Sequence, residues 1–157
     1  MSRPLLLLAA LVAASAAHAQ APPRAADVVA WTARAEGGRR GAEARVVFEA
    51  TVAPGWKLYA LDSAVGRPLS VSLDALPDGV SARAPRQSEP VRAHDAAFDA
   101  EASTFSGTAR IVQPLRVGRA TARGRHAVTG AVRYAVCDHQ ICLPPATAPF
   151  RVTLAVR

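Results

Sequence analysis

The chain has 157 residues, which suits one domain with its own hydrophobic core, and half of its residues are hydrophobic. The formal net charge is +7, and 18 of the 19 basic residues are arginines scattered singly or in pairs. No basic run is interleaved with aromatic residues, so nucleic acid is not an expected partner. We interpret the charge as a solvated arginine-rich surface that could also help docking on acidic partners.

The first 19 residues have the pattern of a secretory signal peptide. Arg3 supplies a positive start, residues 5–14 are an apolar run, and residues 17–19 (AHA) form a small-x-small cleavage pattern. The run is shorter than the ~20 residues that a transmembrane helix needs, so we expect cleavage before Gln20 rather than an uncleaved anchor. The mature chain would then be periplasmic, with no membrane span and with a flexible leader over residues 20–27.

Beyond residue 28 the hydrophobic pattern has a period of two, which is typical of strands with one buried face. The runs that we assign as strands are 45–52, 69–74 and 150–157, with 128–136 as a further strand that leads into Cys137. Turn-forming residues separate the runs at 54–55, 66–68, 77–79 and 106–107. This spacing predicts an all-β fold, a single immunoglobulin-like β-sandwich over residues 28–157.

Residues 84–104 interrupt this pattern. They are polar and show no strand alternation, so we interpret them as a long loop with at most short helical structure. Loops of this length in a compact domain are usually functional or disordered. One large aromatic side chain, Phe98, lies in the middle of the segment.

Cys137 and Cys142 lie in the segment 133–145 (RYAVCDHQICLPP). Two cysteines in an exported protein normally form a disulfide, and the Cys-x4-Cys spacing lets the chain turn back to bring them within bridging range. A loop of about six residues removes only ~2 kcal/mol of unfolded-state entropy, so a purely stabilising role would be small. Disulfides in tight turns are also accessible to attacking thiolates. The spacing alone leaves redox exchange and a passive bridge as open alternatives.

Asp138 and His139 lie between the cysteines. His139 could stabilise a thiolate or accept its proton, and Asp138 would oppose thiolate formation; alternatively, both only solvate an exposed turn. A copper or zinc site is another alternative, with the ligands Cys137, His139 and Cys142 and either His94 or His126. Because the spacing matches no standard zinc motif, we assign no metal ligands.

The segment 132–156 (VRYAVCDHQICLPPATAPFRVTLAV) resembles the end of the N-terminal periplasmic domain of the DsbD family of thiol:disulfide interchange proteins. In that family a strand is followed by a Cys-loop-Cys hairpin, Pro-Pro and a final strand. The segments 53–73 (APGWKLYALDSAVGRPLSVSL) and 94–117 (HDAAFDAEASTFSGTARIVQPLRV) extend the resemblance over most of residues 28–157. The hairpin is its most specific part, although better-known members have a longer one.

The resemblance implies an immunoglobulin-like domain that exchanges disulfides without a cofactor, as a component of a protein-disulfide reductase. A membrane electron carrier of the DsbD or CcdA kind would reduce the pair, which would then reduce periplasmic thioredoxin-like proteins or disulfide isomerases. Since the sequence stops at Arg157, before any counterpart of the family's transmembrane part, we expect that carrier to be a separate protein. The alternative function is a non-catalytic immunoglobulin-like binding or adaptor domain with a structural disulfide.

The resemblance also implies roles for single residues. Cys137 would be the thiol that attacks or is attacked, and Cys142 would complete the exchange, although the sequence leaves open which of the two engages a partner first. The family covers its cysteine pair with a mobile cap loop that carries an aromatic residue, and Phe98 in the segment 94–98 matches it. Tyr59, Asp95 and His139 would line the site.

Overall fold

The computed structural model describes residues 23–157, so the predicted signal peptide and the start of the predicted leader lie outside the described residues. The described chain begins with the short helix α1 (Ala25–Val28). Its Ala25 and Val28 side chains are buried in the main core, so the last residues of the predicted flexible leader are instead part of the fold. Within residues 23–157, no helix is long and apolar enough to cross a membrane.

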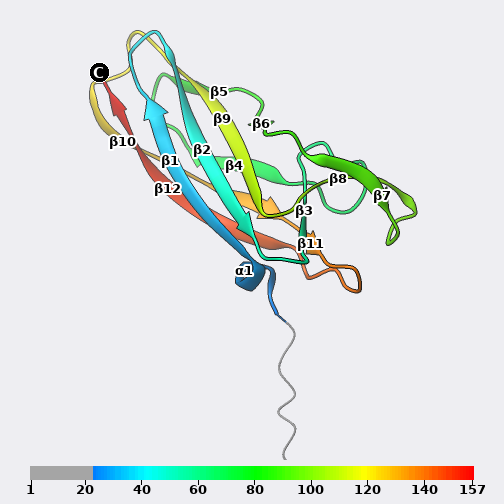
Figure 1. Cartoon of the computed structure of the whole chain (residues 1–157). Helices are drawn as coiled ribbons and strands as arrows, with labels where there is room; N and C mark the ends of the chain where they lie inside the picture. Colours follow the sequence, from blue (N-terminus) through cyan, green and yellow to red (C-terminus); the bar gives the residue numbers. More distant parts are fainter. Residues whose placement is uncertain (1–22) are drawn as a thin grey trace, which may run out of the picture.

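Twelve strands follow in the described part of the chain, and they form three antiparallel sheets (Figure 1). The first sheet has the order β1 (Val29–Gly37), β2 (Glu43–Val52), β9 (Thr108–Val117) and β5 (Val80–Ala82), with β6 (Arg86–Gln87) also paired to β9. The second has the order β12 (Ala146–Val156), β10 (Gly124–Tyr134) and β4 (Ser70–Ala75). The third has the order β11 (Val136–Cys137), β3 (Lys57–Tyr59), β8 (Ala100–Phe105) and β7 (Val91–Asp95).

The first two sheets enclose the main core, and alternate residues of their long strands point into it. In β10 and β12, for example, Val128, Val132, Val152 and Leu154 are buried, whereas Thr129, Ala131 and Thr153 are more exposed. Phe48 of β2 and Phe150 of β12 meet edge to face with ring centroids 4.8 Å apart. This geometry favours aromatic pairs beyond their area of burial. The predicted immunoglobulin-like β-sandwich is thus confirmed.

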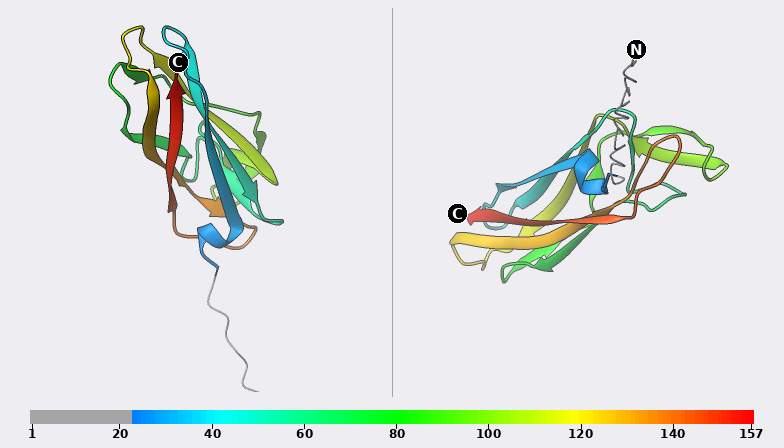
Figure 2. Two further views of the ribbon diagram at one scale, coloured as in Figure 1. Left: turned by 90° about the vertical axis from the view of Figure 1, so that its left-hand side faces the viewer. Right: turned by 90° about the horizontal axis from the view of Figure 1, so that it is seen from below.

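The third sheet lies at one end of the sandwich, away from the C-terminus, and carries the cysteine hairpin on its edge (Figures 1 and 2). It is joined to the main core through Leu58 and Val136, which face each other across β3 and β11 and are both fully buried. Successive residues of a strand point to opposite faces. The neighbours Lys57, Tyr59 and Cys137 therefore lie on the other face of this sheet.

The interpretation of residues 84–104 as a loop is wrong. The segment contains β6, β7 and most of β8, and β7 and β8 pair over five residues as a hairpin. Strand β7 forms an edge of the sheet, and four of its five residues are exposed, including residues on both of its faces. A strand without a buried face has no reason to alternate apolar and polar residues, which is why the sequence pattern did not reveal it.

Candidate redox site

Cys137 and Cys142 form a disulfide, as predicted from their spacing, and their Cα atoms are 4.0 Å apart. The two residues face each other in an antiparallel hairpin. On one side of them the Asp138 N–H donates to the Ile141 carbonyl at 2.9 Å, and on the other the Leu143 N–H donates to the Val136 carbonyl at 3.0 Å. The cysteines thus occupy the non-hydrogen-bonded position, where cross-strand side chains come closest in an antiparallel pair.

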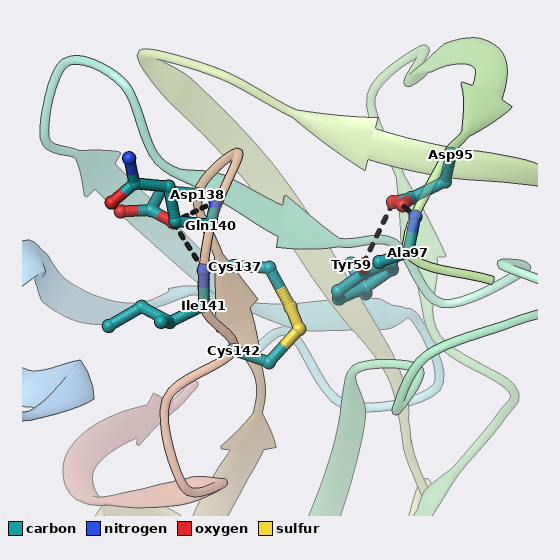
Figure 3. The surroundings of a disulfide bond; sticks show 8 residues. All are labelled: Tyr59, Asp95, Ala97, Cys137, Asp138, Gln140, Ile141 and Cys142. Carbon is teal, nitrogen blue, oxygen red and sulfur yellow. Dashed lines mark hydrogen bonds between the residues drawn. A yellow bond between two sulfur atoms is a disulfide. The ribbon is translucent and has the colours of Figure 1, made fainter.

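The Asp138 side chain holds the turn of this hairpin together. Its Oδ1 atom accepts hydrogen bonds from the backbone N–H groups of Gln140 and Ile141, both at 2.7 Å (Figure 3). These two hydrogen bonds favour the ionised carboxylate and lower the pKa of Asp138 below its usual value. Asp138 therefore organises the loop between the cysteines, and His139 is exposed at its tip.

The two cysteines differ sharply in exposure. Cys137 is only 4% exposed, because it pairs with β3 and packs with Tyr59, Ala102 and Ala135 in a second small hydrophobic cluster. Cys142 is exposed, since it lies on the outer arm of the hairpin. A thiolate from another protein can therefore approach Cys142 more readily than Cys137.

Tyr59 connects the cysteine cluster to the turn between β7 and β8. Its side chain is 1% exposed and lies on the side of the hairpin toward which the two sulfur atoms point (Figure 3). The Tyr59 hydroxyl donates to Asp95 Oδ2 at 2.9 Å, and Asp95 Oδ1 accepts from the Ala97 N–H at 3.0 Å. Burial, and secondarily the Asp95 carboxylate, raise the pKa of Tyr59. Tyr59 therefore remains a neutral hydrogen-bond donor at physiological pH.

The structure brings the predicted aromatic residues together. Phe98 lies in the β7–β8 turn, 43% exposed, and its ring packs edge to face on Tyr59 with centroids 6.0 Å apart. Tyr59, Asp95, Phe98 and Cys137 thus form a continuous chain of contacts, although Phe98 reaches the cysteine cluster through Tyr59.

The histidines of the metal alternative do not gather around the cysteines. His126 is in β10, eight residues before Tyr134, which is roughly 26 Å along an extended strand. His94 is exposed in β7 and its Nε2 atom lies 3.4 Å from Asp99 Oδ1. Among residues 23–157 no group of three or more His, Cys, Asp or Glu side chains is placed to hold a metal ion. Both cysteine sulfurs are bonded to each other.

Two residues near the site were missed from the sequence. Gly66 packs directly on the Tyr59 ring, where a Cβ atom would lie 2.7 Å from the nearest ring carbon. Lys57 is paired with Cys137 across β3 and β11. The sequence indicated Gly66 only as part of a turn. Lys57 could have been found from the alternation along Lys57-Leu58-Tyr59, which puts Lys57 on the same strand face as Tyr59.

The described chain is thus a β-sandwich that carries, in a hairpin at one end, a disulfide between one buried and one exposed cysteine. Residues 25–154 match the family model of the N-terminal domain of the thiol:disulfide interchange protein DsbD. The match covers most of the chain, and the chain belongs to this family. Its cysteine pair, present as a disulfide, is consistent with thiol–disulfide exchange.

Solved structures show the same fold. The N-terminal domain of DsbD from Neisseria meningitidis, in its reduced form, matches with a TM-score of 0.57 and 21% identity, over 91% of this chain and 100% of that one. The N-terminal periplasmic domain of ScsB from Proteus mirabilis matches with a TM-score of 0.51 and 14% identity, over 82% of this chain and 45% of that one. No curated protein matches the sequence.

Proposed function

We propose that this protein is a periplasmic thiol–disulfide exchange domain whose Cys137–Cys142 pair relays reducing equivalents from a membrane electron carrier to periplasmic partner proteins. The observation that carries the proposal is the pairing of one buried and one exposed cysteine in a single small-loop disulfide. A bridge that served stability alone would have no need for an exposed cysteine residue. Family membership supports the same chemistry.

The sequence left open which cysteine engages a partner first, and the greater exposure of Cys142 favours Cys142. A thiolate of the donor attacks the Cys142 sulfur, the Cys137–Cys142 bond breaks, and its electron pair stays on Cys137 as a thiolate. The second donor thiol, after losing its proton to solvent, attacks the mixed disulfide and releases Cys142 as a thiolate. The two thiolates take up protons from solvent, so the domain is then a dithiol and the donor a disulfide.

The same sequence of steps in the opposite sense passes the electrons on. The Cys142 thiolate attacks an acceptor disulfide, and Cys137 then attacks Cys142 in the resulting mixed disulfide. The acceptor leaves as a dithiol, and the original bridge is restored. The acceptors that fit are thioredoxin-like proteins and disulfide isomerases, because these proteins present exposed cysteine pairs of their own.

A periplasmic location fits these steps. The first 19 residues have a signal-peptide pattern. The match to the Proteus mirabilis protein is to a domain described as periplasmic. An oxidising compartment is also where a disulfide persists until a dedicated carrier reduces it.

Trapping of mixed disulfides in cells tests the proposal. In Cys137→Ala, the exposed Cys142 keeps its thiol but has no internal thiol to resolve a mixed disulfide, so adducts should accumulate on non-reducing gels. Cys142→Ala, which leaves only the buried thiol, is the matched control and should trap much less. If neither variant traps a protein through its remaining thiol, the relay function is wrong.

A redox titration of the purified domain separates exchange from a structural bridge. An exchanging pair should equilibrate with glutathione, whereas a reduction potential well below about −300 mV would indicate a structural disulfide. The adaptor alternative makes the opposite prediction in cells, because a Cys137→Ala/Cys142→Ala double variant would then retain its partner binding.

A further inference from the structure

Lys57 is the cross-strand partner of Cys137. β11 and β3 pair antiparallel with Cys137 opposite Lys57 and Val136 opposite Leu58. Directly opposed residues share one face of a sheet, with Cβ atoms typically ~5 Å apart. Cys137 therefore lies between two cross-strand neighbours, with Cys142 on one side and Lys57 on the other.

Lys57 is also the single basic residue on this face of the third sheet. The register places Cys137, Lys57 and Tyr59 there, together with Ala100, Ala102 and Thr104 of β8 and Val91, Ala93 and Asp95 of β7. Arg92 and His94 fall on the opposite face. Lys57 is the only lysine in a chain with 18 arginines, it is exposed, and it makes no salt bridge within residues 23–157.

The acidic groups around Cys137 are already engaged. Asp95 accepts hydrogen bonds from Tyr59 and from the Ala97 N–H, and Asp138 accepts two from the backbone of its turn. Their negative charges oppose a thiolate at Cys137. His139, between the two cysteines in the sequence, is exposed at the hairpin tip. The loop between β3 and β4 also packs against the cluster around Cys137 through Val65 and Gly66, and its charged residues are Asp62 and Arg67. Lys57 is the basic residue that the strand pairing places directly opposite Cys137.

We propose that Lys57 stabilises the thiolate of Cys137 through its charge, and so assists the departure of this sulfur when a partner attacks Cys142. The inference rests on the proposed exchange function. When the donor thiolate bonds to the Cys142 sulfur, the electron pair of the broken bond moves to the Cys137 sulfur, which is the buried one. A leaving thiol of lower pKa departs faster, and a flexible lysine ammonium opposite it lowers that pKa.

Thiol titration of a single-cysteine protein tests the inference. In a Cys142→Ser background the Cys137 thiol titrates alone, and its thiolate is followed by ultraviolet absorbance. We expect Lys57→Gln to raise the pKa of the Cys137 thiol by ~0.5–1 unit, a size in keeping with a charge on a cross-strand neighbour in a partly solvated site. Lys57→Arg should restore the lower pKa, and high salt should reduce the difference.

In the intact disulfide, Lys57→Gln should slow reduction by dithiothreitol about two- to fivefold, with Lys57→Arg close to the unmodified protein. Arg125→Gln is the control for net charge, since Arg125 is exposed in β10, at the far end of this strand from the hairpin. An unchanged Cys137 pKa in Lys57→Gln, or an equal shift in Arg125→Gln, overturns the inference and leaves the proposed function standing. Failure to trap mixed disulfides in cells would instead overturn the proposed function.

Discussion

Gly66 packs against Tyr59 so closely that replacing it with alanine should disturb the redox site. Gly66 has a positive φ of +73°, and an added Cβ would lie 2.7–2.8 Å from three carbons of the Tyr59 ring. Carbon atoms in van der Waals contact are normally ~3.5–4.0 Å apart. The ring cannot easily move aside, because it is 1% exposed and its hydroxyl is bonded to Asp95.

Gly55 offers a matched control for this substitution. It also has a positive φ, +84°, but a Cβ atom there would meet nothing within 4 Å. Gly55→Ala therefore carries only the cost of placing an L-residue in the left-handed region, about 1–2 kcal/mol. Gly66→Ala carries the same cost and, in addition, the strain of overpacking a filled site, about 1–3 kcal/mol. The difference between the two variants isolates the contact with Tyr59.

Urea unfolding of the oxidised protein measures this difference. We expect Gly66→Ala to lower the free energy of unfolding by about 2–5 kcal/mol and Gly55→Ala by about 1–2 kcal/mol. A second pair in a Tyr59→Leu background, where the ring is absent, should show the two glycine variants nearly equal. If Gly66→Ala and Gly55→Ala already cost the same with Tyr59 present, the close packing described for this ring is wrong.

Three further predictions concern the same end of the molecule. If the Phe98 ring covers the site, Phe98→Ala should speed reduction of the disulfide by dithiothreitol several-fold, and an unchanged rate would rule out the cap role. The substitution should lower the free energy of unfolding by less than the ~3–5 kcal/mol lost at a fully buried phenylalanine, because Phe98 is 43% exposed. The pKa of Tyr59 is raised in the folded protein, so its contribution to stability is complete below the unfolded pKa of 10.0 and decreases as the pH rises above that value. Urea unfolding between neutral and alkaline pH should therefore show the stability difference between the unmodified protein and Tyr59→Phe shrinking above pH 10. The pKa of Asp138 is lowered in the folded protein, so its contribution to stability is present above the unfolded pKa of 3.8 and is lost as the pH falls through the folded pKa. In Asp138→Asn the amide oxygen can still accept the turn hydrogen bonds, so the stability advantage of the unmodified protein over this variant should disappear in acid. A difference in stability that does not depend on pH would contradict this assignment.

The sandwich was predictable from sequence where strands have one buried and one solvated face. The predicted run 45–52 falls in β2, and 150–157 falls in β12 except for its last residue. The segment 128–136 covers the later part of β10 and the start of β11. Strand β9 was not assigned, and it contains Pro114, a residue that normally argues against a central strand. The Pro114 carbonyl accepts a hydrogen bond from the Arg83 N–H, so it faces the side of β9 on which β5 and β6 lie. The proline nitrogen faces the same side of β9, at the gap between the residues paired with β5 and those paired with β6. No sheet hydrogen bond is lost there.

The candidate site was predictable only in part, because its members come together through the third sheet. The disulfide follows from local spacing, and the structure confirms it. The hydrogen bond between Tyr59 and Asp95 joins residues 36 positions apart and depends on the pairing of β3 with β8 and of β8 with β7. Similarly, the burial of Cys137 depends on its pairing with β3. The family resemblance named Tyr59 and Phe98, but it did not indicate which cysteine is accessible.

Along β3 and β11, residues that stabilise the main core alternate with residues that surround the disulfide. Leu58 and Val136 form one cross-strand pair, face the main core and are fully buried. The next pair, Lys57 and Cys137, faces the opposite side together with the disulfide. Substitution of Leu58 or Val136 by alanine should therefore unfold or destabilise the whole domain, as for other large-to-small core changes. Changes at Lys57 should alter the reactivity of the disulfide while leaving the free energy of unfolding nearly unchanged, because an exposed and unpaired lysine contributes little to it.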